Sequence, residues 1–358
     1  GEGFTCVDDV ARTAVVALLN AERTGAAEAE SMARGTLELV LAMQAEDGRF
    51  YNFIREDGSI NRDGETSFLD HGWWAARALW SLGAGVRYFH ERDPVLADRL
   101  GEAAEKLLPW YDRDLERYGE HDGVDGTPVP TWLVKGASDI TSEAVLGLLE
   151  LQQARPTPAG AERIGRLCDG LAELQVRDES SLLHGAHPST ASRPRYWHHW
   201  GSRQTMALAR AARLLPHHPG RERWLESARL EADRFFRRLL DTHVPEEIDG
   251  DEVRPYPQIA YGLNSIVLGA LELYRATDER RYLAMALEAA SWYVGRNPPR
   301  VRMYDEATGR CFDGVIGDDA VNRNSGAEST IEALLALEEL HREASPRGGS
   351  AAATTDPE

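Results

Sequence analysis

Apolar residues recur at three- and four-residue spacing along nearly the whole chain, which is the pattern of amphipathic helices. Six such segments carry Ala, Gly and Leu around most of their circumference and start near residues 8, 73, 144, 206, 264 and 330. Their spacing of about 58 to 71 residues is regular enough to indicate a structural repeat. Alternating runs rich in Val, Ile and Thr are almost absent. The sequence therefore predicts an all-α protein.

A second, more charged helix is predicted between consecutive members of this set. Each of these segments has one charged face and one apolar face, which suits a helix on the outside of a larger assembly. They span residues 26–44, 94–112, 158–175, 220–240 and 279–295. The repeat is then one inner helix, a short turn, one outer helix and a long return segment. It predicts five complete pairs and an unpaired sixth inner helix.

Two architectures suit such helix pairs, a closed α/α toroid and an open α-solenoid. Solenoid repeats keep their connections short, whereas the return segments here run to about 20 residues or more and are rich in Trp, Tyr, Gly, His and carboxylates. The sequence therefore predicts an (α/α)6 toroid of helical hairpins. We expect residues 1–343 to form this single domain and residues 344–358, which are small, polar and Pro/Gly-bearing, to be a disordered tail.

The charge balance narrows the class of partner. The 358 residues hold 40 Lys and Arg against 59 Asp and Glu, so the net charge is 40 − 59 = −19. This charge opposes binding to nucleic acid and to anionic membrane surfaces, and it favours neutral or cationic ligands. No stretch approaches the roughly 20 apolar residues of a membrane helix, and the start of the chain lacks the pattern of a signal peptide. We expect a soluble, cytoplasmic protein.

The segments before the six inner helices share one character. If the inner helices are parallel, their N-termini open on one face and these segments converge there. All of them are polar and four of the six also contain aromatic residues, whereas the segments before the outer helices show only ordinary caps and exposed charge. They span residues 4–12, 65–77, 137–145, 195–205, 254–264 and 321–329. The sequence predicts one ligand cavity at this face.

Helix capping explains part of the pattern. Ser325 and Glu328 match the S-x-x-E capping box, in which the two side chains satisfy backbone N–H groups at a helix start. Capping does not explain Asn322, Arg323 and Asn324 just before them. Glu328 is therefore predicted to cap the last inner helix and is a candidate for a second role.

Aromatic rings beside Asn, Gln, Arg, His and carboxylates are typical of a sugar site. The rings cover the C–H faces of a pyranose, and the polar groups bind its hydroxyls. Some of the aromatic residues are expected to be core. The candidate substrate-binding residues are Asp8, Arg12, Trp73, Trp74, Trp197, His198, His199, Gln204, Tyr256, Gln258, Tyr261, Asn264, Tyr304, Asn322, Arg323 and Asn324.

Carboxylates in the same segments suggest glycoside hydrolysis, which uses one carboxylic acid and one carboxylate and requires no cofactor. A helix N-terminus stabilises the anionic partner, whereas burial among aromatic residues raises the pKa of the acid. Asp9 and Asp139 are the preferred catalytic pair, with Asp70, Glu143 and Glu328 as reserve candidates.

The chain also contains residues that bear on two further chemistries. His198 and His199 could move a proton at a sugar carbon, as an epimerase requires. Asp313, Asp318 and Asp319 lie in one loop, but their spacing lacks the EF-hand pattern, so no metal is predicted. Cys6, Cys168 and Cys311 lack metal-site spacing and indicate neither a zinc site nor a disulfide framework.

Several motifs resemble a known bacterial group. They are VDDVAR (7–12), DGRFYNF (47–53), GWWAARALWSLG (72–83), MYDEATGRCFDGV (303–315) and NRNSGAEST (322–330). They resemble the six-hairpin, glycosidase-like domain that occurs alone or fused to glycosyltransferase modules, and the resemblance extends to about residue 342. It implies an α/α toroid similar to those of glycoside hydrolases, unsaturated-uronyl hydrolases and N-acylglucosamine 2-epimerases, and a glycosyltransferase module as a candidate partner. It transfers no catalytic pair.

Three functions stay open at this point, because a fold does not fix a function. The leading hypothesis is a glycoside hydrolase acting on an oligosaccharide or glycoside. The alternatives are a sugar epimerase and a non-catalytic glycan-binding module of a glycosyltransferase system. A terpene cyclase also uses an α/α toroid, but the chain lacks a DxDD motif.

Overall fold

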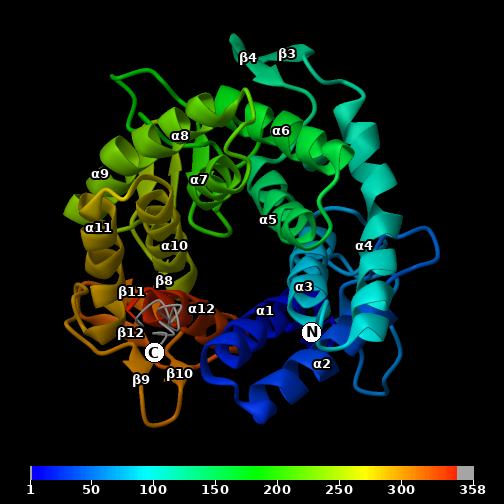
Figure 1. Cartoon of the computed structure of the whole chain (residues 1–358). Coiled ribbons are helices and arrows are strands. Elements are labelled where there is room, and N and C mark those ends of the chain that lie inside the picture. Colours follow the sequence, from blue (N-terminus) through cyan, green and yellow to red (C-terminus); the bar gives the residue numbers. More distant parts are fainter. Residues whose placement is uncertain (1, 345–358) are drawn as a thin grey trace, which may run out of the picture.

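The computed structural model describes residues 2–344. Six helices form an inner ring, and each is joined by a short turn to an outer helix, except the last (Figure 1). The inner helices are α1 (Val7–Thr24), α3 (Trp73–Phe89), α5 (Ser138–Ala154), α7 (Gln204–Leu214), α10 (Ala260–Thr277) and α12 (Ala327–Ala344).

The outer helices follow α1, α3, α5, α7 and α10 in turn, as the sequence predicts. α8 runs through a π-helical turn, η2 (Glu231–Phe236), into α9, and α11 ends in a 3-10 turn, η3 (Ser291–Val294). Within residues 2–344, α12 has no outer partner. The outer helices are α2 (Ala27–Ala42), α4 (Pro94–Leu115), α6 (Pro158–Glu173), α8 (Arg221–Leu230) with α9 (Arg237–Thr242), and α11 (Arg280–Ala290).

The inner ring is closed. Each inner helix packs on the next, and α12 returns to α1, so the first and last inner helices lie side by side (Figure 1). The prediction of a closed toroid rather than an open solenoid is confirmed. None of the helices in residues 2–344 is long and apolar enough to cross a membrane. The predicted tail lies outside the described residues, apart from Ala344, which ends α12.

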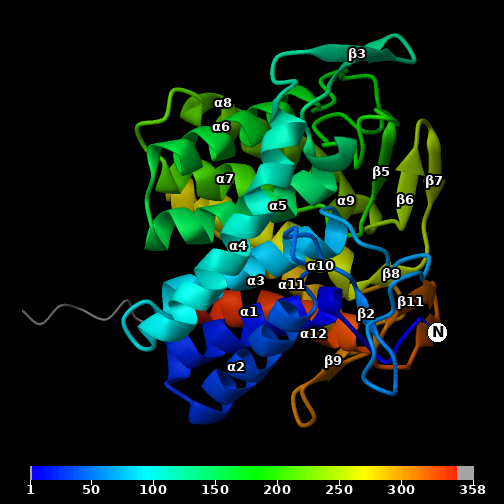
Figure 2. The same ribbon diagram turned by 90° about the vertical axis from the view of Figure 1, so that its right-hand side faces the viewer.

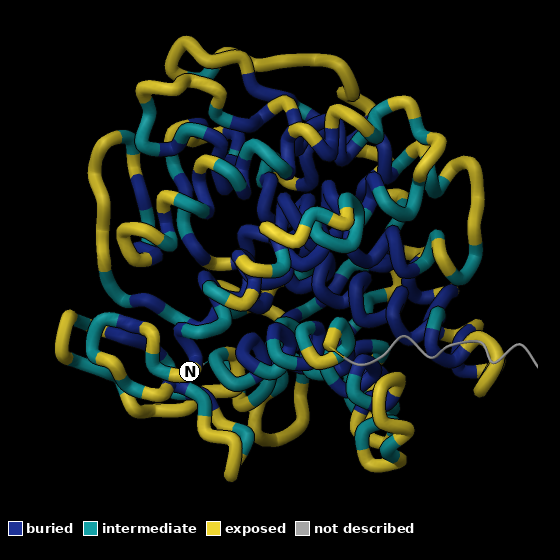
Figure 3. Tube along the Cα trace, turned by 60° about the vertical axis from the view of Figure 1, so that its left-hand side comes forward, coloured by how far each residue is buried: buried dark blue, intermediate teal, exposed yellow. Residues whose placement is uncertain are grey.

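Burial explains the two kinds of helix. In α3 nearly every residue from Trp74 to Phe89 is buried, because the helix is packed on several sides, whereas α2 buries only Ala33, Leu37 and Val40. The buried part of the chain gathers accordingly in the middle of the molecule (Figure 3). Close packing of α3 on α5 requires glycine, since a Cβ at Gly147 would lie 2.7 Å from the backbone of Leu79.

Two inner helices begin earlier than predicted. α5 begins at Ser138 and α10 at Ala260, rather than near residues 144 and 264. In α5 the missed residues include buried polar side chains such as Asp139, which apolar periodicity does not register as helical. In α10 the missed residues are 260–263, which the sequence places in the polar segment before the helix.

Short strands gather on one side of the ring, at the N-terminal ends of the inner helices (Figure 2). They pair as β1–β2, β3–β4, β5–β6–β7, β8–β11–β12 and β9–β10. Their bounds are β1 Thr5–Cys6, β2 Phe53–Ile54, β3 His121–Val124, β4 Thr127–Pro130, β5 Tyr196–His198, β6 Glu247–Asp249, β7 Glu252–Arg254, β8 Gln258–Ile259, β9 Tyr304–Asp305, β10 Arg310–Cys311, β11 Gly314–Gly317 and β12 Ala320–Asn322. We call this side of the ring the mouth.

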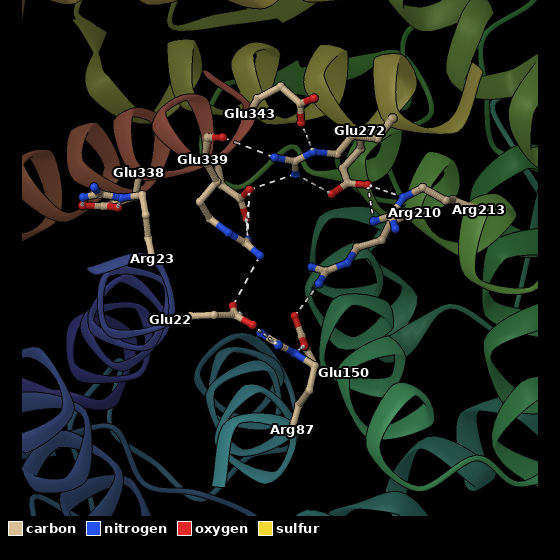
Figure 4. A network of polar contacts seen from close by, with 12 residues as sticks. Glu22, Arg23, Arg87, Glu150, Arg210, Arg213, Glu272, Glu338, Glu339 and Glu343 are labelled. Atoms are coloured by element: carbon tan, nitrogen blue, oxygen red, sulfur yellow. Dashed lines mark hydrogen bonds and ion pairs between the residues drawn. The ribbon is translucent and has the colours of Figure 1, made fainter. Parts of the chain in front are cut away.

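Ion pairs join the inner helices at the end opposite the mouth (Figure 4). Arginines near helix C-termini are favoured by the helix dipole, and glutamates of neighbouring helices neutralise them. The pairs run around the ring as Arg23–Glu338, Arg342–Glu22, Arg87–Glu22, Arg87–Glu150, Arg210–Glu150, Arg213–Glu272 and Arg275–Glu339. Arg23 and Arg342 bind across the seam between α1 and α12.

Candidate functional site

The floor of the mouth is a fully buried ion-pair cluster. Arg203, directly before α7, binds Glu143 of α5 and Glu332 of α12, both at 2.9 Å. Arg12 of α1 binds the same Glu332 at 2.7 Å. All four side chains are at most 1% exposed. Because each buried charge has an opposite charge in contact, the cluster holds four inner helices together at the centre of the ring.

Arg77 of α3 extends the cluster toward the solvent. Its Nη1 lies 2.6 Å from Oδ1 of Asp8, and its Nη2 donates a hydrogen bond to the hydroxyl of Tyr261 in α10. The guanidinium also lies over the ring of Trp73, 4.7 Å from its centroid. Burial raises the pKa of Tyr261, so its hydroxyl stays protonated. The Arg77 guanidinium thus brings together one carboxylate and one phenol.

Two carboxylates at the rim share one nitrogen. Asp9 and Glu328 accept hydrogen bonds from Nη2 of Arg12 at 3.0 and 3.2 Å. Their two bonded oxygens are therefore at most 3.0 + 3.2 = 6.2 Å apart. The side chains are 29% and 51% exposed, so both carboxylates are open to solvent.

The capping box predicted for Glu328 is wrong. α12 begins at Ala327, and Asp313 accepts hydrogen bonds from the N–H of Gly326 and the hydroxyl of Ser329. The Ser325 hydroxyl instead lies 3.3 Å from that of Thr330. Because Asp313 arrives from a distant part of the chain, local spacing could not reveal it.

Asp139 has a different environment from the rim carboxylates. It lies in the first turn of α5 and is only 4% exposed. Burial raises its pKa, although His198 and the N–H of Ile140 oppose that shift. Nε2 of His198 lies 3.3 Å from Oδ2 of Asp139, while Nδ1 of His198 accepts the N–H of Trp200 at 3.1 Å. The single ring N–H of a neutral His198 is therefore at Nε2, and it points to Asp139.

His199 faces the protein interior. It is fully buried, and in residues 2–344 neither ring nitrogen makes a hydrogen bond of normal geometry, although the ring interacts with the backbone of Pro245. Burial lowers its pKa to about 3. A Cβ at Gly262 of α10 would lie 2.8 Å from Cβ of His199, so the His199 side chain fits against bare helix backbone. The two adjacent histidines thus occupy unlike environments.

The structure brings several predicted site residues together. Asn264 accepts from Arg203 at 2.7 Å and joins the buried cluster. The predicted residues that meet at the mouth, directly or through one arginine, are Asp8, Asp9, Arg12, Trp73, Glu143, Tyr261, Asn264 and Glu328, with Asp139 and His198 as a second contact pair.

Other predicted residues lie elsewhere. Trp74 and Trp197 are packed in the core, at 6% and 3% exposed. Asp70 is held by Lys135 at 3.1 Å and by the N–H of Gly72, and the buried Gln204 donates to Ser138. Tyr256 and Gln258 line a separate cavity, described below.

Tyr304 and the residues before α12 also lie outside the cluster. Tyr304 is in β9 and Asn322 ends β12. Arg323 lies over the ring of Phe312 at 5.3 Å, and the backbone oxygen of Asn324 accepts from Asp313. Their proposed sugar contacts stay predictions.

The acidic loop does not form a convergent ligand set. Asp313 binds the start of α12, and Asp318 accepts from the hydroxyl of Tyr256 at 2.5 Å. No group of three or more His, Cys, Asp or Glu side chains in residues 2–344 is arranged to hold a metal ion.

Sequence reasoning missed Arg77, Arg203 and Glu332. Arg77 follows Trp73 by one helical turn, and Glu332 follows Glu328 by one turn, so each lies on the same helix face as a predicted residue. A charged residue within a helix that is apolar on all sides must be paired inside the protein. That signal could have found Arg77 and Glu332, but not Arg203, which lies directly before α7.

No family model matches the chain, and no curated protein matches it either. Solved structures do match. A cellobiose 2-epimerase from Spirochaeta thermophila shares 17% identity, with 94% of this chain and 86% of that chain covered and a TM-score of 0.67. A D-mannose isomerase shares 14% identity over 95% and 88% of the two chains, with a TM-score of 0.64.

A structure described as a possible member of the GH105 family, from Salmonella enterica serovar Paratyphi A, shares 15% identity over 96% and 85% of the chains, with a TM-score of 0.58. The chain has the (α/α)6-toroid fold. At these identities the shared property is the fold, which confirms the predicted six-hairpin, glycosidase-like architecture.

Proposed function

We propose that the protein is a carbohydrate-active enzyme, and specifically a glycoside hydrolase whose acid is Asp139. One observation carries the proposal. Burial raises the pKa of Asp139, whereas Asp8, Asp9 and Glu328 at the same mouth are paired with arginines. Carboxyl groups held in such unlike environments are what acid and base roles require.

In this mechanism Asp139 protonates the glycosidic oxygen as the bond to the anomeric carbon breaks. Asp9, at the rim, then acts on that carbon directly or through a water molecule. Glu328 and Arg12 position Asp9, since both carboxylates bind the same guanidinium. His198 positions Asp139 by donating to its Oδ2. Trp73 offers a ring face at the mouth, fixed by Arg77.

A sugar epimerase or isomerase is the second candidate, because His198 and Asp139 are in contact. In such a pair the charged form of Asp139 can take a proton from a carbon next to a carbonyl, while His198 holds the carboxylate in place. Arg77 and Tyr261 offer hydrogen-bond donors to the enediolate oxygen that such a step forms. The names of the epimerase and isomerase neighbours also support this candidate.

One experiment separates the two reactions. The protein is incubated in D2O with neutral mono- and oligosaccharides, and products are followed by chromatography and proton NMR. Hydrolysis gives new reducing ends without deuterium on carbon. Epimerisation or isomerisation gives deuterium on the carbon next to the carbonyl. The matched control is Asp98→Asn, which changes an exposed carboxylate of α4.

Binding without any product would overturn both enzymatic proposals and favour a glycan-binding module. A glycosyltransferase partner stays a prediction, and co-purification with a candidate module would test it.

A further inference from the structure

A second cavity lies at the edge of the mouth, outside the ring of inner helices. It has a volume of about 560 Å³, within the usual range for ligand sites. Its walls come from the end of α9, the strands β6 and β7, and the residues before β8. We call it the rim pocket. Its apolar walls include Leu182, Leu239, Ile248, Val253, Pro255 and Tyr256.

Polar groups are placed around these walls. The hydroxyl of Tyr256 donates to Asp318 at 2.5 Å, which fixes the orientation of the tyrosine ring. Arg238 and Thr242 also line the pocket, where the Thr242 hydroxyl donates to the backbone oxygen of Arg238 and Nη1 of Arg238 donates to that of Leu182. Apolar ring faces with a few fixed polar groups suit a sugar unit, whose C–H faces are apolar and whose edges are hydroxyls.

Gln258 adds a donor of fixed orientation to the wall of the rim pocket. Its side chain lines the rim pocket, is 2% exposed, and accepts the indole N–H of Trp292 at its Oε1. Because that indole is a donor only, the amide orientation is fixed and the NH2 group is left over. This NH2 group has no partner in residues 2–344. The NH2 group is therefore available to donate to an acceptor bound in the cavity.

The rim pocket adjoins two of the six segments that form the mouth. Its wall strand β6 pairs with β5, which places Glu247 opposite His198, and the N–H of His199 donates to the oxygen of Glu246 at 3.1 Å. Gln258 is followed, three residues later, by Tyr261, which contacts Arg77. The pocket and the mouth therefore share backbone segments.

We propose that the rim pocket binds a second unit of the carbohydrate substrate, so that the protein prefers a neutral oligosaccharide to a single sugar. This inference rests on the proposed function. The mouth holds the reacting unit, and Tyr256 and Gln258 hold a further unit of the same chain.

The test fills the pocket without touching the mouth. Val253 is 49% exposed on the edge strand β7, so Val253→Trp puts an indole into the pocket at little risk to folding. Val95→Trp, at a 73% exposed valine of α4, is the matched control. Cello-, malto- and manno-oligosaccharides of two to four units and the methyl glycosides of their single sugars are the probes.

The expected result is a KM at least tenfold higher for the longer substrates in Val253→Trp, with kcat and the single-sugar kinetics unchanged and the control like wild type. An unchanged KM for the longer substrates overturns the inference and leaves the proposed function intact. If wild type turns over no probe, the proposed function fails. Calorimetry with the same probes then tests separately whether the rim pocket binds a sugar unit. Weaker binding by Val253→Trp than by wild type then supports it, and equal or undetectable binding overturns it.

Discussion

Nε2 of His198 lies 3.3 Å from Oδ2 of Asp139, and the other ring nitrogen of His198 is occupied by a backbone N–H. The histidine is thereby fixed with its proton toward the carboxyl group. A buried carboxyl with a raised pKa and a fixed neighbour is the group on which the proposed acid catalysis depends.

The first prediction concerns the stability cost of Asp139. Because its pKa is raised in the folded state, its contribution to stability is present below its ordinary pKa of 3.8 and is lost as pH rises through the folded value. Asp139→Asn removes that cost but has one oxygen where Asp139 has two, which accept from the N–H of Ile140 and from His198. Because the two effects oppose each other, we expect the free energy of unfolding at pH 7, measured by urea titration, to stay within about 1 kcal/mol of that of wild type. A large loss of stability would show that Asp139 is structural.

The second prediction concerns the pH dependence of activity. An acid must be protonated to act, so turnover should fall as pH rises through the pKa of Asp139, which lies above 3.8. The pH profile of kcat/KM measures this limb. In His198→Gln the limb should move, because the side chain that favours the charged carboxylate is altered. If kcat/KM falls at the same pH in the variant as in wild type, His198 does not influence the pKa of the catalytic acid.

The third prediction concerns His199. Its pKa is lowered from 6.5 to about 3 in the folded protein. Between these pH values the unfolded chain therefore carries a proton on His199 that the folded protein does not. The stability that neutral His199 contributes is present above pH 6.5 and is lost as pH falls toward 3. By linkage this loss is about 3 to 4 kcal/mol between pH 6.5 and pH 4. Urea titrations of wild type and His199→Gln between pH 7 and 4 check it. The variant should lose less stability on acidification, and parallel curves would contradict the assignment.

The fourth prediction concerns the ion pairs opposite the mouth. Burial opposes ionisation of Glu272, but Arg213, Arg210 and Arg275 outweigh it and lower its pKa from 4.5 to about 2. Glu272→Gln should therefore cost about 3 kcal/mol of unfolding free energy at pH 7. Since the folded pKa is depressed, this contribution is present above pH 4.5 and is lost as pH falls toward 2. The difference between wild type and variant should shrink over that range.

A surface control accompanies that measurement. Glu162→Gln changes the exposed partner of Arg166 on α6, and it should cost less than about 1 kcal/mol because exposed pairs are weak. Equal losses of unfolding free energy in the two variants would show that the ion pairs opposite the mouth stabilise the closed ring no more than an exposed surface pair does.

The fold was predictable because its main determinant is repetitive. The period of inner and outer segments and the contrast between α3, buried on nearly all sides, and α2, buried on one, are both properties of local sequence. The start of α5 was misplaced because polar residues such as Asp139 are buried there by neighbouring helices, and the start of α10 because residues 260–263 follow directly on a polar segment.

The candidate site was predictable in part. Asp8, Asp9, Arg12 and Glu328 meet as expected from parallel helix starts. Their partners Arg77, Arg203 and Glu332 were missed because pairing between helices is a tertiary property. The same reason explains Tyr256, whose segment turns outward to line the rim pocket instead of the centre.

The central claim is that Asp139 is the acid of a glycoside hydrolase. The most direct test compares wild type, Asp139→Asn and the control Asp98→Asn on the oligosaccharide that wild type cleaves, with product release measured by chromatography and affinity by calorimetry. The account predicts that Asp139→Asn loses turnover by about 100-fold or more while its affinity changes less than about threefold. Turnover in Asp139→Asn within about threefold of both wild type and Asp98→Asn would contradict it.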